Sequence, residues 1–378
     1  QLIMNDSNTD IDDIREHFNN ITFSNYQKSK VRKELTNCIY KNKIENTLYW
    51  CGELVCSGHF LDIWDIIILY YTKYIYTINP KLVIYLSMRF DNFKSILTNG
   101  YTENILRLRN NIKIRNIFSE ILLILCFSKK NQTFEPYKLD KSEEFDLLNM
   151  SSRFKAPHID YIKPIYQDED PKELVIPVNE IIYSLESEDL LNIYHWFEWI
   201  LEYENKMSKD KKTFVCETRI YAPSGCQKDI IWIIWDIIFY YLKKTDYSIY
   251  NKLDKTTVKK QVNLKSQIIN SLYNLFIIKY NSTTKRRRKL LIYVAFKFIL
   301  TNIDINTPII SSSVKQQVEI VLEKNDNIYH EIKKNERSTN TGYLFKDVKK
   351  QNLEKTIEKL ETMDNFNYQD ITNNLEII

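Results

Sequence analysis

The sequence predicts an all-α fold made of two helical halves. Only five glycines occur in 378 residues, whereas an average protein contains about 7% glycine. Tight strand turns and phosphate-binding loops both need glycine, so its scarcity favours helices joined by other loop residues. Apolar residues also recur at helical spacing in most segments. Finally, the tetrapeptide Trp-Asp-Ile-Ile occurs twice, at Trp64–Ile67 and Trp235–Ile238, which suggests two related halves.

Further matches favour an internal duplication, which would suit a helical-repeat, solenoid-like arrangement. A Ser-Gly pair precedes each copy, at Ser57-Gly58 and Ser224-Gly225, and Lys81–Phe90 reads like Lys289–Phe298. The alternative is chance matching in a chain rich in Ile, Asn, Lys and Tyr. The stretch between the Trp and Lys blocks is much longer in the second copy, which favours chance. The residues alone leave both explanations open.

The N-terminal half is expected to span residues 1–135. Apolar residues from Ile63 to Tyr74 follow one helical face. The dipeptide Asn79-Pro80 predicts the next helix start, because proline is well tolerated at a first helical position. A third stripe runs from Ile114 to Leu125. The longest apolar runs are interrupted by charge and shorter than the about 18 residues of a membrane-spanning helix, so we expect buried core helices and no membrane span.

Five of the eight prolines fall in residues 136–177, which we interpret as an irregular linker between the halves. The C-terminal half is then expected at 178–345. The second Trp-Asp helix is predicted to start at a capping box formed by Ser224 and Gln227, and its apolar run from Ile230 should be the most buried helix. Residues 346–378 are expected to form an amphipathic helix followed by a tail.

The clearest candidate site is the basic run that precedes the apolar segment Leu290–Leu300. Cations at a helix N-terminus oppose the helix dipole, so the run is unfavourable unless an anion binds there. A nucleic-acid phosphate backbone would supply this anion. The alternatives are a solvated charged loop or a nuclear-targeting run. The residues concerned are Lys285, Arg286, Arg287, Arg288 and Lys289.

A second basic set consists of Arg107, Arg109, Lys113 and Arg115. Their spacing predicts that Arg109 and Lys113 share a helix face, with the other two nearby. The set lacks interleaved aromatic residues for base stacking, so it would contact only the nucleic-acid backbone. The competing interpretation is a solvated helix face balanced by nearby glutamates.

Other chemistry finds little support in the sequence. Cys51, Cys56 and His59 lack the usual zinc spacing of paired cysteines, and the six cysteines of the chain suit buried free thiols, so we expect no metal and no cofactor. No phosphate-binding loop, dinucleotide-binding turn or nucleophile motif occurs. Asp65 and Asp236 interrupt apolar helices, where each would cap a helix or pair with an arginine.

A further group of segments is distinctive beyond its helical spacing. These segments are Gly52–Phe60, Asn79–Leu82, Arg89-Phe90, Asp170–Leu174, Tyr221–Pro223, Asp229–Asp236, Thr341–Phe345 and Asn352–Leu360. In them the chain resembles an uncharacterised protein of giant nucleocytoplasmic large DNA viruses. The resemblance covers most of the chain and implies a viral origin, with the host cytoplasmic viral factory or the virion as location. It implies no activity for any residue.

These observations favour a non-catalytic helical scaffold that contacts DNA or RNA backbone in viral replication, transcription or packaging. The net charge is only +4, so such binding would depend on the two local basic clusters. One alternative is a virion or assembly protein that binds viral protein partners through apolar surfaces. Another is an enzyme or regulatory subunit, which a deep pocket with convergent polar groups would favour.

Overall fold

A computed structural model describes residues 9–15, 18–98, 105–139, 145, 150–244, 255–336 and 355–357. In these ranges the protein is all-α, which confirms the predicted fold class. Thirteen α-helices are joined by turns and by short 3₁₀ or π segments, and the same ranges contain one isolated bridge, Ile21 to Gln27, and no strand. None of the described helices is both long and apolar enough to cross a membrane. The duplication and the helical-repeat arrangement stay predictions.

The chain forms two compact units. Unit 1 contains Gln1–Asn131 together with Pro308–Ile378, and unit 2 contains Gln132–Thr307. Residues 308–345, which the sequence analysis assigned to the C-terminal half, therefore fall in unit 1. The expected linker, 136–177, falls in unit 2, where its described part includes three short 3₁₀ segments, Ser151–Arg153, Asp160–Ile162 and Lys172–Leu174.

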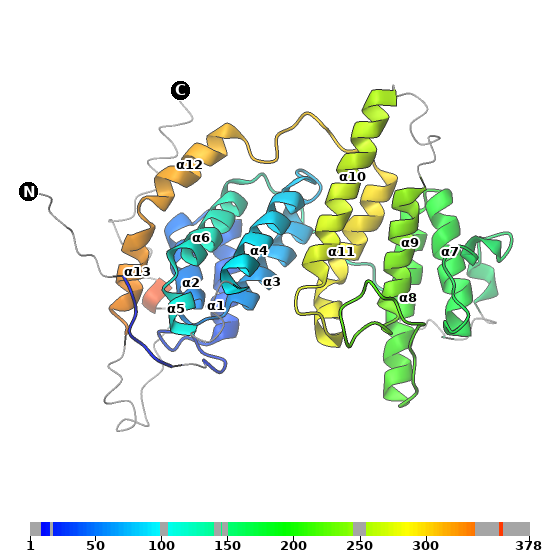
Figure 1. Ribbon diagram of the computed structural model, residues 1–378, viewed down its shortest axis with the longest axis horizontal. Helices are drawn as coiled ribbons and strands as arrows, with labels where there is room; N and C mark the ends of the chain where they lie inside the picture. Colours follow the sequence, from blue (N-terminus) through cyan, green and yellow to red (C-terminus); the bar gives the residue numbers. More distant parts are fainter. Residues whose placement is uncertain are drawn as a thin grey trace, which may run out of the picture. The chain divides into compact units, whose positions relative to one another are not determined.

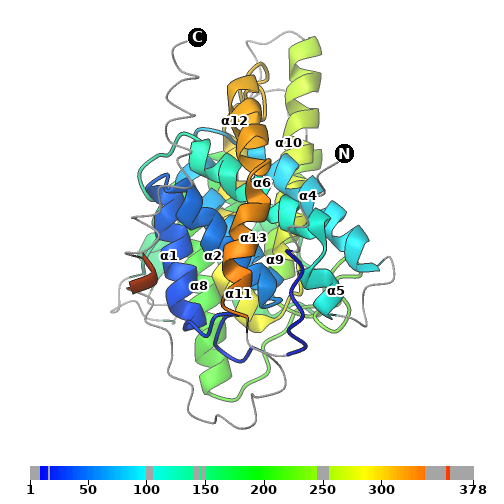
Figure 2. The same ribbon diagram turned by 90° about the vertical axis from the view of Figure 1, so that its left-hand side faces the viewer.

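Helix α2 is the centre of unit 1. Every residue of α2 except Glu45 is buried, and the helix packs against α1, α3, α6 and α13. Figure 2 faces the side on which α12 and α13, drawn in orange, cover this group, with α12 against α6 and α13 against α2. The helices of unit 1 are α1 Lys28–Tyr40, α2 Ile44–Cys56, α3 Phe60–Tyr70, α4 Leu82–Thr98, α5 Ile105–Arg109, α6 Ile112–Phe127, α12 Ser312–Leu322 and α13 Asn325–Lys333.

The two Ser-Gly pairs have different local structures. Gly58 ends α2 with φ +71°, its N–H donates to the Val55 carbonyl, and the His59 N–H donates to the Leu54 carbonyl at 2.9 Å. This is a glycine-terminated helix end that leads directly into α3. Gly225, with φ +80°, instead lies in a turn closed by the Cys226 N–H and the Pro223 carbonyl at 3.0 Å.

The predicted capping box at Ser224 and Gln227 is therefore wrong. Helix α9 begins only at Ile231, and its first turn is stabilised by Asp229, whose Oδ1 accepts from the Ile231 N–H at 3.0 Å. The Ser-to-Gln spacing matched the pattern of a capping box, but the glycine between them turns the chain before the helix starts. Trp235 of the repeated motif is fully buried in α9, as Trp64 is in α3.

Helix α11 packs against α8, α9 and α10 in unit 2, and Figure 1 shows it beside α10. Helix α10 occupies most of the extra residues that separate the second Trp motif from its Lys block, so the longer gap contains a complete helix. The α7 and α8 helices form a second closely packed pair. The bounds are α7 Val175–Glu186, α8 Leu190–Lys209, α9 Ile231–Lys243, α10 Lys255–Phe276 and α11 Ser282–Leu300.

A buried ion-pair network holds the segment before α9. Arg219 Nη1 lies 2.6 Å from Asp170 Oδ1, and Arg219 Nε lies 2.8 Å from Asp236 Oδ2. The side chains of Arg219 and Asp170 are almost completely inaccessible. Tyr221 also donates to Asp236 at 2.8 Å. The expectation that Asp236 pairs with an arginine is thereby confirmed. Through Arg219, which also pairs with Asp170, α9 is connected to the loop that precedes α7.

Basic clusters and a candidate binding groove

The basic run lies inside α11 and does not precede it. The helix begins at Ser282 with a capping box, in which the Asn281 side chain accepts from the Thr284 N–H and the Thr284 hydroxyl accepts from the Asn281 N–H. Lys285 is therefore already one turn into the helix. The N–H groups at the helix N-terminus are capped by Asn281, and the cations lie beyond this end of the helix dipole. The expectation that the basic run needs a bound external anion is therefore not supported.

Lys285 is neutralised inside unit 2. Its Nζ contacts Glu204 Oε1 at 2.5 Å and Asp229 Oδ1 at 2.8 Å, and its side chain is only 3% exposed. Burial raises the pKa of Glu204, and the attraction of Lys285 opposes that rise. The anion that the sequence analysis assigned to nucleic acid is supplied here by two carboxylates of the protein.

Two further residues of the run also make internal contacts. Arg288 is buried and its Nη1 donates to the carbonyls of Phe276 and Ile278, at the end of α10. Lys289 Nζ lies 2.7 Å from Glu198 Oε1. The side chains of Arg286 and Arg287 are exposed, so they are the two members of the run that face solvent.

The second basic set is divided between two helices. Asn111 caps α6 and accepts from the N–H groups of Lys113 and Ile114, so Arg109 in α5 and Lys113 in α6 do not share a helix face as expected. Arg109 is fully buried and donates to the carbonyls of Cys56 at 2.5 Å and Asp13 at 2.8 Å. It therefore holds the chain before α1 against the end of α2.

Arg115 is also buried in unit 1. It donates to the Arg109 carbonyl at 3.0 Å and to Asn110 Oδ1 at 2.9 Å, and its guanidinium lies 4.3 Å from the ring centroid of Tyr329. Arg107 and Lys113 are exposed. Of the nine basic residues expected to bind nucleic acid, the five with internal contacts described above are Arg109, Arg115, Lys285, Arg288 and Lys289.

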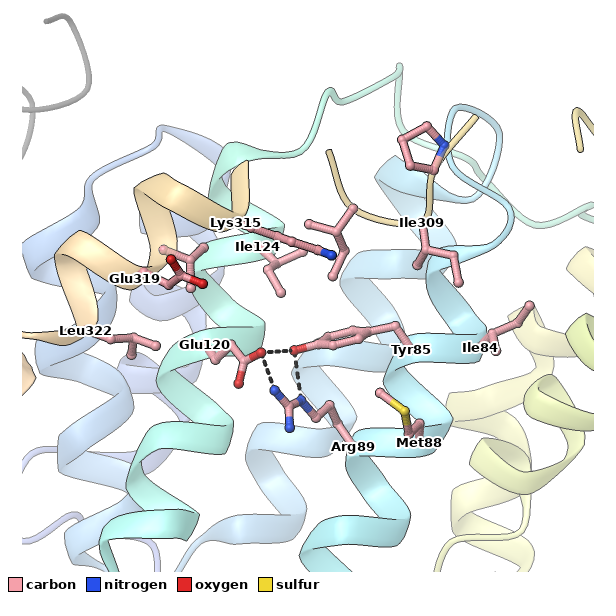
Figure 3. Close-up of a pocket in the computed structure, with 13 residues that line it drawn as sticks. Ile84, Tyr85, Met88, Arg89, Glu120, Ile124, Ile309, Lys315, Glu319 and Leu322 are labelled. Carbon is pink, nitrogen blue, oxygen red and sulfur yellow. Dashed lines mark hydrogen bonds and ion pairs between the residues drawn. The ribbon is translucent and has the colours of Figure 1, made fainter. Parts of the chain in front are cut away.

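Unit 1 contains a groove between α4 and α12, with α6 as its floor (Figure 3). Its volume is about 690 Å³, within the range of pockets that bind ligands. We call it the α4–α12 groove. The lining residues are Ile84, Tyr85, Met88, Arg89, Glu120, Ile124, Pro308, Ile309, Ile310, Lys315, Val318, Glu319 and Leu322.

Three polar side chains meet at the floor of the groove. Tyr85 donates to Glu120 Oε1 at 2.7 Å, and Arg89 donates to Tyr85 Oη at 2.9 Å and also pairs with Glu120 (Figure 3). Burial raises the pKa of Tyr85, so the phenol keeps its proton and serves as a donor. The Arg89 pKa is lowered by burial, but the hydrogen bonds to Glu120 and Tyr85 outweigh this and raise it overall. The three groups satisfy one another.

The side walls of the groove are apolar except at two positions on α12, which carry Lys315 and Glu319. Met88 lines the α4 side of the groove, and its exposed fraction is 50%. Across from α4, Lys315 and Glu319 stand one turn apart. In Figure 3 the Lys315 side chain runs toward Ile309, and its ammonium lies away from the Glu319 carboxylate.

Sequence reasoning did not find this groove. Its walls come from segments that are far apart in the chain, and Pro308 lies in the segment that returns to unit 1. Glu120 interrupts the apolar run Ile117–Phe127 and is one of the glutamates near the second basic set. A glutamate in the middle of an apolar run indicates that a polar partner lies nearby. From the sequence this would predict an ion pair such as the one with Arg89, but it would not predict the groove.

The cysteines behave as buried thiols. All six are free, and five are buried. Burial raises the pKa of Cys126 to about 11 and that of Cys38 to about 12, so these thiols are protonated at neutral pH. The part of the chain that the structure describes contains no group of three His, Cys, Asp or Glu side chains placed to hold a metal ion.

No protein-family model, no curated protein and no solved structure matches the sequence.

Proposed function

We propose that the protein is a non-catalytic helical scaffold that holds an apolar segment of a partner protein in the α4–α12 groove. The observation that supports this proposal is an apolar groove of about 690 Å³ with the exposed side chain of Met88 on one wall. Exposed apolar surface on a folded unit often marks a binding site. A partner that covers this surface removes it from water, and this burial stabilises the complex.

The floor of the groove favours binding over catalysis. Tyr85, Arg89 and Glu120 bond to one another, and the raised pKa of Tyr85 makes its hydroxyl a poor nucleophile at neutral pH. Because these three groups satisfy one another, they shape the floor of the groove and leave no activated group for chemistry. The resemblance to an uncharacterised giant-virus protein adds a context to this proposal, namely a virion or a viral factory in the host cytoplasm.

Replacing Met88 with aspartate should strongly weaken binding of an apolar helical peptide. Burying a methionine side chain contributes about 1.5 to 3 kcal/mol, and a carboxylate at this place would add a desolvation cost. We expect the dissociation constant of a leucine-rich fluorescent helical peptide, measured by anisotropy, to rise at least about tenfold.

Leu61→Asp is the matched control for Met88→Asp. Leu61 is 43% exposed on α3 in the same unit and does not line the groove. The control variant should bind the peptide as the unchanged protein does. Equal losses in both variants, or no peptide binding by the unchanged protein, would reject the groove as the binding site.

Nucleic-acid backbone binding is a second candidate, which the adjacent exposed side chains of Arg286 and Arg287 favour. The double variant R286Q/R287Q should weaken DNA binding and lower the slope of log affinity against log salt by about 2, because each phosphate contact contributes about 0.9. The exposed pair Lys259 and Lys260 on α10 provides the control K259Q/K260Q. Unchanged affinity and slope in R286Q/R287Q would count against this candidate.

A further inference from the structure

A segment of unit 1 that belongs to no helix is held like a bound peptide. Residues 9–15, which we call the strap, run beside α5 and α13 (Figure 2). The Ile11 N–H donates to Asn110 Oδ1 at 3.0 Å, and Asn110 Nδ2 donates to the Ile11 carbonyl at 2.8 Å. Glu336 Oε1 accepts from the next two N–H groups, at 2.6 and 2.7 Å. The Ile11 side chain is only 1% exposed and anchors the strap in unit 1.

Two arginines hold the ends of the strap. Arg115 Nη1 donates to the Thr9 carbonyl at 3.3 Å. Arg109 Nη1 donates to the carbonyls of Asp13 at 2.8 Å and Arg15 at 3.0 Å. Side chains of other segments thus satisfy the polar main-chain groups of the strap. Because every peptide has these main-chain groups, the same bonds are available to another peptide in the same place.

The charge of the strap is complementary to that of the side chains that hold it. The strap contains three aspartates and one arginine, so it is acidic. The charged side chains that bond to its main chain are three cations and one anion, namely Arg109, Arg115, Lys333 and Glu336. We call these four residues, together with Asn110, the strap site. A peptide that replaces the strap is therefore expected to be acidic as well.

The strap leaves one buried donor of this site unused. Arg109 is fully buried, and within the described ranges its Nη2 has no hydrogen-bond partner. The Asp13 carboxylate attracts Arg109 but is bonded to Arg15 of the strap itself. An unsatisfied buried donor costs stability. A peptide that offers an acceptor to Arg109 Nη2 therefore gains an interaction that the strap does not make.

We propose that the strap site binds an acidic peptide segment of a partner protein, and that the strap is the competitor of this segment within the same chain. The partner segment has an apolar residue in the place of Ile11 and carboxylates beside it. Because binding displaces the strap, the strap sets the concentration of partner that is needed. The strap site is separate from the α4–α12 groove, and the inference does not rest on the proposed function.

The test uses the full chain and a fluorescent, terminally capped peptide with the strap sequence, Thr-Asp-Ile-Asp-Asp-Ile-Arg. In Ile11→Ser the strap loses its anchor, while every residue of the strap site is kept. We expect this variant to bind the peptide at least about tenfold more tightly than the unchanged chain, because the strap competes less well. Replacing the three aspartates of the peptide with asparagine should weaken its binding to the variant about fivefold. Fluorescence anisotropy measures both effects.

Ile14→Ser is the matched control, because Ile14 also lies on the strap but is 66% exposed. This control should bind the peptide as weakly as the unchanged chain does. Adding Asn110→Ala to Ile11→Ser removes the two bonds that the amide offers to the peptide main chain. The double variant should bind the peptide about tenfold more weakly than Ile11→Ser.

Three results would overturn the inference. The first is that Ile11→Ser binds the peptide no more tightly than the unchanged chain, and the second is that the aspartate and asparagine peptides bind equally. The third is a concentration-dependent dimer of the unchanged chain that Ile11→Ser abolishes, since the occupant is then a second copy.

Hydrogen exchange decides the question if Ile11→Ser does not fold. Excess peptide should speed exchange at the N–H groups of residues 11–13 in the unchanged protein, because the strap leaves its site when the peptide binds. Exchange that the peptide does not alter would overturn the inference by itself.

Discussion

Replacing Arg219 with methionine is expected to lower the free energy of unfolding by about 3 to 5 kcal/mol. The change leaves Asp170 buried without its cation, and Asp236 loses the same partner. Methionine fills a similar volume, so the loss reflects uncompensated charge and not a cavity. Urea denaturation monitored by tryptophan fluorescence measures the effect, since the fully buried Trp235 lies in the helix that carries Asp236.

Arg286→Met is the control for this prediction, because Arg286 is an exposed arginine of the same unit. Its effect should stay within about 0.5 kcal/mol. A loss of less than about 1 kcal/mol in Arg219→Met would show that water reaches Asp170 and that the network is not buried as described.

Replacing Lys285 with methionine is expected to destabilise unit 2 by about 2 to 3 kcal/mol at neutral pH. The change leaves Glu204 and Asp229 without the cation that holds them together. The loss is smaller than for Arg219 because both carboxylates keep partial access to water. The same measurement also tests the role of Lys285. If this lysine served only to bind nucleic acid, its replacement would leave the free energy of unfolding unchanged.

The effect of Lys285→Met should depend on pH in a defined direction. The folded-state pKa of Glu204 is raised above its ordinary value of 4.5. The folded protein therefore binds the Glu204 proton more tightly than the unfolded chain does. As the pH rises above 4.5, ionisation of the buried carboxylate lowers the free energy of unfolding. Lys285 offsets the cost. The difference in stability between the two proteins should therefore be largest near pH 7 and narrow as the pH falls toward 4.5. A constant difference would contradict the assignment to Glu204.

The sequence was sufficient to predict the fold class, because scarce glycine and helical spacing of apolar residues are local properties. It was not sufficient to identify the central helix of unit 1. Helix α2 contains Asn46, Thr47 and Glu53, all buried, and these polar residues interrupt any apolar stripe. Glu53 is satisfied by the Ser24 N–H and hydroxyl, a partner outside the helix that no periodicity indicates.

The basic clusters show a second limit of sequence reasoning. Clustering along the chain indicated a shared surface, but Lys285 turns to Glu204 and Lys289 turns to Glu198, both on α8. These partners lie far away in sequence, so only the packing of α8 against α11 brings them together. A charged residue on a predicted helix can therefore belong to the interior when the neighbouring helix supplies the opposite charge.

The return of the chain to unit 1 after Pro308 has a consequence for synthesis of the protein. Helix α13 covers α2 at Gly52, where a side chain would collide with Ile332. This face of α2 therefore stays open until Asn325–Lys333 has left the ribosome. Unit 2, which is continuous, can fold first. The nascent N-terminal helices thus expose an apolar face during that interval, and exposed apolar surface of this kind promotes aggregation.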